Sequence, residues 1–66
     1  MKLEITLSPK PTRGALLDAL EHVKEQIVAG ALSGELDFDH RYIATGQSES
    51  DHYSGAWFTD NGGNNP

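Results

Sequence analysis

The sequence predicts a small α+β domain in which one helix packs on a three-stranded sheet, in the order strand, helix, strand, strand (β-α-β-β). One segment repeats its apolar residues at helical spacing, and three shorter segments alternate apolar and polar residues as strands do. A chain of 66 residues has room for one small core, so residues 1–59 are expected to form a single domain. Residues 60–66 contain no core side chain and are predicted to be a disordered tail.

The helix is expected from about residue 13 to residue 29. Thr12 can cap its first turn through the side-chain hydroxyl, and Gly30 stands where a left-handed residue often ends a helix. Large aliphatic residues recur at intervals of four, three and four. This spacing predicts a buried stripe made of Leu16, Leu20, Val23 and Ile27, which Leu17, Ala19 and Val28 widen. Because a short helix is not stable alone in water, the sheet must cover this stripe.

Three segments show the alternation of strands, namely residues 2–7, 35–44 and 53–59. His40 is a polar residue on the apolar face of the second segment, which suggests a bulge or an exposed edge there. In the third segment Trp57 is expected to face the helix, so that Phe58 faces away. Residues 46–51 are polar apart from one glycine and are predicted to form a loop. The third strand could lie at an edge or between the other two, and the pattern leaves both positions open.

The composition restricts the possible functions. The formal net charge is −5, which argues against binding nucleic acid or an anionic membrane through a basic face. No apolar run approaches the ~20 residues of a membrane span, and the N-terminus alternates instead of forming a signal core. The chain has no cysteine, so neither a disulfide nor a thiolate metal site can stabilise it. We expect a cytoplasmic protein stabilised by packing, by homodimer formation or by docking to a partner protein.

Two groups of residues are candidates for binding a partner. Asp37 and Asp39 share one face of the second strand about 7 Å apart. This acidic row could be a solvated surface, a docking patch for a basic protein or a mimic of DNA phosphates. Of the neighbours Trp57 and Phe58, one should be exposed and could form an apolar patch with Ile43. The candidate partner-binding residues are therefore Asp37, Asp39, Ile43, Phe58 and Trp57.

Residues suited to metal binding also lie in the region of the two last strands. The groups that zinc or manganese accept there are Asp37, Asp39, His40, Asp51 and His52. His40 and His52 would approach each other if these strands pair. No known ligand spacing such as HExxH appears, and surface histidines are the ordinary alternative. We predict no metal site and no other cofactor.

Catalysis has two possible sources in this sequence. Asp18 and His22 could pair one helical turn apart, and hydroxyl groups are available at Ser48, Ser50 and Ser54. There is no GxSxG elbow, no phosphate-binding loop and no dinucleotide glycine pattern. A chain of this length also leaves little room for a cleft that excludes water. The sequence therefore predicts that the protein is not an enzyme.

A short N-terminal strand is followed by the helix ALLDALEHVKEQIVAG, the dipeptide Ser33-Gly34, a variable polar stretch and the aromatic strand GAWFT. Over residues 1–59 this arrangement resembles small uncharacterised proteins carried by phages, prophages and plasmids. The resemblance implies a mobile-element origin and a small sheet-plus-helix fold, and it implies no reaction. Taken together, we expect a small acidic protein-interaction module. The alternative is a DNA mimic that inhibits a nucleic-acid-binding enzyme of the host.

Overall fold

The computed structural model describes residues 2–60 of the chain. Its elements are β1 (Leu3–Ser8), α1 (Arg13–Val28), β2 (Ser33–Ala44) and β3 (Gln47–Thr59). One helix packed with a three-stranded sheet confirms the predicted α+β class and the order of the elements. Of the tail predicted at residues 60–66, residues 61–66 lie outside the described part of the chain. None of the helical residues between 2 and 60 forms a segment long and apolar enough to cross a membrane.

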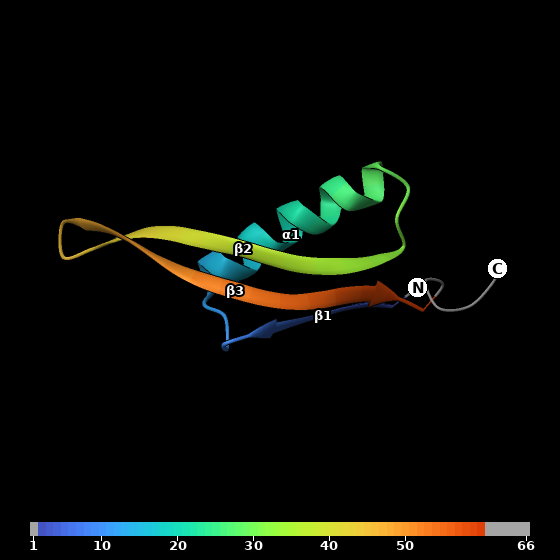
Figure 1. The fold of residues 1–66 in the computed structure, drawn as a ribbon, viewed down its shortest axis with the longest axis horizontal. Coiled ribbons are helices and arrows are strands. Elements are labelled where there is room, and N and C mark those ends of the chain that lie inside the picture. The colour runs from blue at the N-terminus through green and yellow to red at the C-terminus, as the bar shows by residue number, and fades with distance from the viewer. Residues whose placement is uncertain (1, 61–66) are drawn as a thin grey trace.

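β3 is the central strand of the sheet, whose order is β1-β3-β2 (Figure 1). It pairs antiparallel with both neighbours, so that Leu3 lies opposite Thr59 and Ser33 lies opposite Phe58. β1 and β2 are therefore parallel to each other, and α1 connects them across one face of the sheet. The pattern of the sequence leaves the position of the third strand open, and the structure places it in the middle.

β2 and β3 form a long hairpin around a two-residue turn. Thr45 and Gly46 have φ angles of 48° and 80°, the left-handed pair that a tight turn between twisted strands requires. The loop predicted at residues 46–51 is wrong, because β3 already begins at Gln47. Figure 1 shows this end of the hairpin extending beyond α1 and β1. Residues 47–52 are exposed on both faces of the sheet. Their sequence therefore does not alternate apolar and polar residues as a half-buried strand does, and it resembles a loop.

α1 begins and ends close to the predicted positions. Thr12 is the N-cap, and the Ala15 N–H donates a hydrogen bond to Thr12 Oγ1 at 3.2 Å. Gly30 follows the last turn with a φ of 105°, a conformation that glycine adopts without steric cost. The capping chemistry read from the sequence therefore sets both ends of the helix.

α1 presents small side chains to the sheet instead of the predicted large ones. Ala15 and Ala19 are fully buried, and Val23 is 2% exposed. Val23 and Ala19 confirm the predicted stripe, but it is wrong at three of its four central members, which are 41–45% exposed: Leu16, Leu20 and Ile27. It is also wrong at Leu17 and Val28, which are 60% and 80% exposed. The reason is steric. Large side chains already fill the facing surface of the sheet, and only small helix residues allow the two layers to approach closely.

The sheet supplies the large side chains of the core, which are Leu36, Phe38, Tyr53 and Trp57. Trp57 is 1% exposed and faces α1, as predicted. Its Nε1–H donates to Gln26 Oε1 at 2.8 Å, and Gln26 Nε2 donates to the Glu35 carbonyl at 3.0 Å. Gly34 leaves room for this arrangement, since a Cβ at that position would overlap Gln26 Oε1. The buried indole thus has an acceptor, and the C-terminal half of α1 is attached to the sheet.

Replacing Gly55 with Ala should destabilise the fold by about 2–3 kcal/mol. Gly55 lies opposite Leu7, where an added Cβ would overlap the Thr6 carbonyl oxygen, so β1 must move away from β3. Urea denaturation measures the change. Ser54→Ala is the matched control on the exposed side of the same strand and should stay within about 0.5 kcal/mol of the parent. Equal stability of the two variants would contradict the close approach of β1.

Candidate functional site

Three surfaces carry side chains that could meet a ligand or a partner. The outer sheet face is the side turned away from α1, and it includes Asp37, Asp39, His52 and Phe58. The hairpin pocket lies between the start of α1 and the hairpin and is lined by Thr12, Gly14, His40, Tyr42 and Asp51. The α1 face is the exposed apolar side of the helix and consists of Leu16, Leu17, Leu20, Ile27 and Val28.

On the outer sheet face, His52 binds both carboxylates of the predicted acidic row. It stands opposite Asp39 in the β2–β3 register. Its Nδ1 lies 2.7 Å from Asp39 Oδ1, and its Nε2 lies 2.5 Å from Asp37 Oδ1. The hydrogen bond to Asp39 raises the pKa of His52 above its ordinary 6.5; partial desolvation opposes this, and the charge of Asp37 adds to it. The two aspartates are therefore not a free row of negative charge when His52 is protonated.

The apolar residues predicted for partner binding do not form one patch. Phe58 is 47% exposed and Ile43 is 73% exposed, both on the outer sheet face. Phe58 pairs with Ser33, ten positions from Ile43 along β2, which corresponds to about 33 Å. Trp57 is in the core and offers no exposed surface. Of the predicted site, only Asp37 and Asp39 are brought together, and His52 is what joins them.

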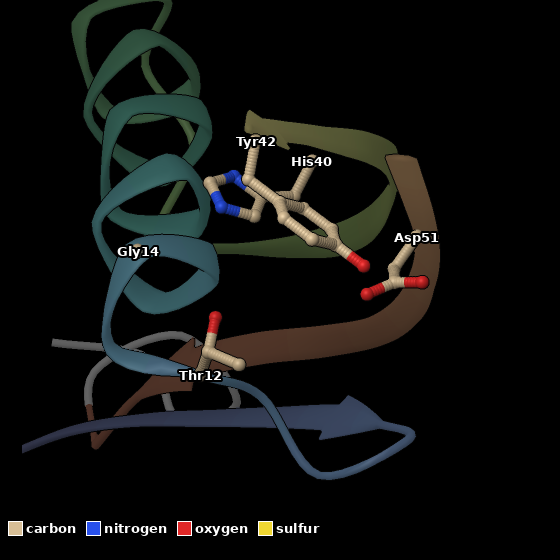
Figure 2. A pocket seen from close by; sticks show the side chains of 5 residues that line it. All are labelled: Thr12, Gly14, His40, Tyr42 and Asp51. Carbon is tan, nitrogen blue, oxygen red and sulfur yellow. The ribbon is translucent and has the colours of Figure 1, made fainter. Parts of the chain in front are cut away.

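The hairpin pocket has a volume of about 310 Å³. His40 Nδ1 lies 2.8 Å from Asp18 Oδ2, and the His40 ring stacks on Tyr42 with centroids 6.0 Å apart. Figure 2 shows the Tyr42 hydroxyl pointing toward the Asp51 carboxylate. Loss of solvation and then the neighbouring Asp51 raise the pKa of Tyr42. The strand register is continuous, so β2 has no bulge at His40; β2 is instead an edge strand of the sheet, and Asp18 bonds His40 from the helix.

The polar groups of this pocket are engaged within the fold. The ring of His40 lies against the first turn of α1, where a Cβ on Gly14 would be 2.9 Å from His40 Nε2. The Thr12 hydroxyl accepts the hydrogen bond from Ala15 and serves as the helix cap. Although an Asp–His pair can orient a general base, this pair holds the start of α1 on the hairpin. We interpret the pocket as structural.

The other predicted catalytic and metal-binding groups are dispersed. Asp18 bonds His40 instead of His22, whose ring packs on Phe38 with centroids 4.8 Å apart. His40 and His52 project from opposite faces of the sheet, so they do not approach each other. Within residues 2–60, no group of three or more His, Cys, Asp or Glu side chains is arranged to hold a metal ion. The predicted serines all lie exposed on β3: Ser48, Ser50 and Ser54.

Sequence reasoning missed the α1 face because it assigned all five of these residues to the buried stripe. The exposed fractions run from 41% for Leu16 to 80% for Val28. A shallow hollow of about 340 Å³ lies on this face, lined by Leu17, Leu20, Glu21 and Lys24. A signal was present in the sequence. Alanines one turn apart at positions 15 and 19 form a second, smaller apolar stripe beside the leucines, and only one of the two stripes can face the sheet.

Comparison with family models, curated proteins and solved structures finds no match to this chain. Its function is therefore inferred from the three surfaces. The hairpin pocket uses its polar groups to hold the helix, and the outer sheet face joins two of its carboxylates through His52. The α1 face, in contrast, is covered by no other element within residues 2–60.

NMR titration of His52 should give a pKa above 6.5, and Asp39→Asn should move that pKa back toward 6.5. A pKa that is raised in the folded state means that protonated His52 contributes to stability fully below pH 6.5. That contribution is lost as the pH rises through the raised value, so the urea midpoint of the parent should fall more across this window than that of Asp39→Asn. Glu35→Gln, on the same face, is the control. An unchanged His52 titration in Asp39→Asn would contradict the assigned contact.

Replacing Asp18 with Ala should destabilise the protein by about 1–2 kcal/mol, because the half-buried His40 loses its hydrogen-bond partner. Urea denaturation at one fixed protein concentration measures the effect. Glu25→Ala removes an exposed carboxylate from the same helix and should have little effect. Loss of stability in both variants to the same extent would assign the effect to helix charge instead of the His40 contact.

Proposed function

We propose that this chain is a small acidic protein-interaction module that contacts another protein through the α1 face. The observation that supports the proposal is the exposure of large apolar side chains along one side of the helix. Leu17 is 60% exposed, Leu20 is 43% exposed and Ile27 is 45% exposed. Single exposed apolar residues are common on soluble proteins, but contiguous ones rimmed by charges are typical of binding surfaces. Glu21 and Lys24 supply such charges beside the leucines.

The proposal assigns no chemical reaction to the chain. Two of the imidazoles within residues 2–60 pair with carboxylates that hold elements together, His40 with Asp18 and His52 with Asp37 and Asp39. A cytoplasmic setting and a mobile-element origin belong to the same proposal. The first is supported by the acidic, cysteine-free composition, and the second by the resemblance described above.

DNA mimicry through the outer sheet face is the second candidate. A mimic needs a series of unpaired negative charges spaced like phosphates, and β2 offers Glu35, Asp37 and Asp39 on one face. Two of these three share His52, which reduces their net charge whenever the imidazole is protonated. The α1 face has no comparable internal partner, and for this reason we rank the apolar contact first.

A photo-cross-linking amino acid placed at Leu17 should yield covalent adducts with protein in cells that make this chain. The same residue placed at Ser50, which is exposed on β3, should not. Leu20→Glu combined with the probe at Leu17 should remove the adducts, since a carboxylate on the α1 face opposes burial against an apolar partner. Adducts only at Ser50 would indicate that the partner binds the outer sheet face instead of the α1 face. No adduct at either position would contradict the interaction module.

A further inference from the structure

We infer that the protein bound by the α1 face is a second copy of this chain, whose own α1 packs antiparallel on the first. The inference rests on the proposed function and names its partner. Symmetric dimers use the same surface of both copies, so the surface must be complementary to itself. The arrangement of side chains along α1 meets this condition in its apolar residues, in its charges and in its size.

The apolar residues of the α1 face are distributed symmetrically about the level of residue 22. An antiparallel pair with a two-fold axis at that level places Leu16 beside Val28 of the other copy, and Leu17 beside Ile27. Leu20 then meets the aliphatic part of Lys24. The spacing of positions 17, 20, 24 and 27 is three, four and three, the alternation found where two helices pack side by side. The hollow lined by Leu17 and Leu20 is available to receive a side chain of the other helix.

The charges on the same face are also complementary to themselves. In the antiparallel arrangement Glu21 of each copy lies beside Lys24 of the other, which forms the same ion pair twice. Within residues 2–60 neither side chain has an ion-pair partner of its own. The remaining acidic residues lie mainly on the sheet and its hairpin, away from α1. Two copies can therefore pair through α1 while their acidic surfaces stay apart, which limits the repulsion expected from a net charge of −5.

The size of the face indicates a dimer of moderate affinity. Full burial of a large aliphatic side chain removes roughly 100 Å² of apolar surface from water. The five side chains of the α1 face are 41–80% exposed, and they would therefore contribute about 270 Å² per copy. A standard interface buries about 800 Å² per partner, a little more than half of it apolar. The α1 face supplies about half of that apolar area. We therefore expect a dissociation constant in the micromolar range and not in the nanomolar range.

Sedimentation equilibrium tests the inference on the full chain from about 5 μM to about 1 mM. The parent should shift from one chain to two as its concentration rises. Glu21→Lys and Lys24→Glu should each weaken this shift about tenfold in concentration, because each brings like charges together at the helix pair. An equimolar mixture of the two variants should recover association. In the mixed pair, each substituted copy faces a copy of opposite charge at both contacts.

Glu35→Lys and Lys10→Glu are the matched controls, because they change the net charge by the same amounts at exposed positions away from the α1 face. They should leave the parent's association within about twofold, and their mixture should show no recovery. Circular dichroism confirms that every variant is folded, which is expected since positions 21 and 24 are exposed.

A parent that stays monomeric to about 1 mM overturns the inference, and so does a dimer that neither charge variant weakens. A monomeric parent leaves the proposed function intact if the probe at Leu17 still forms adducts with a different protein. Absence of both self-association and adducts removes the inference and the proposed function together. A dimer that responds to the controls as strongly as to the α1 variants assigns the effect to net charge and also rejects the helix pairing.

Discussion

The fit between α1 and the sheet determines most of this structure. The inner face of β2 and β3 carries a phenylalanine, a tyrosine and a tryptophan in a short stretch, and these rings leave no space for large helix side chains. Only alanine at positions 15 and 19 allows the helix to lie close enough to seal them from water. The leucines next to these alanines must then turn outward. The exposed α1 face is thus a consequence of how the core is packed.

Two polar contacts fix the rotation of the helix about its own axis. Near the N-terminus Asp18 holds His40, and near the C-terminus Gln26 accepts from Trp57. The two lie about 12 Å apart along the helix, since each residue adds about 1.5 Å. Rolling the helix to bury its leucines would break both contacts and leave a buried indole N–H without an acceptor. The orientation of the α1 face is therefore set by hydrogen bonds as well as by side-chain volume.

The strands were more predictable than the helix rotation, for a physical reason. A strand has only two faces, so one large buried residue such as Trp57 determines the direction of its neighbours, including the exposed Phe58. A helix has a continuous range of rotations, and the sequence 15–20 holds two overlapping apolar stripes. Which stripe is buried depends on Phe38 and Trp57, which lie far away in the chain. Apolar size alone therefore selects the wrong stripe.

The candidate sites depended on strand register, which local patterns determine poorly. Treating residues 46–51 as a loop hides the tight turn at Thr45 and Gly46, and this turn is what places His52 opposite Asp39. The same register separates Ile43 from Phe58 by the length of the sheet. The acidic residues could be listed from the sequence, but the imidazole that joins them and the distance between the apolar candidates could not.

The protruding end of the hairpin is attached to the domain by backbone pairing and carries no side chain of the buried core. A two-residue turn of Thr45 and Gly46 closes it in open solvent, where an added Cβ on Gly46 would meet no atom within 4 Å. Extra residues inserted there would leave the packing beneath α1 undisturbed, because loop length costs little free energy once the strands are paired. Foreign peptides for display or labelling can therefore be inserted at this tip with little loss of folding stability.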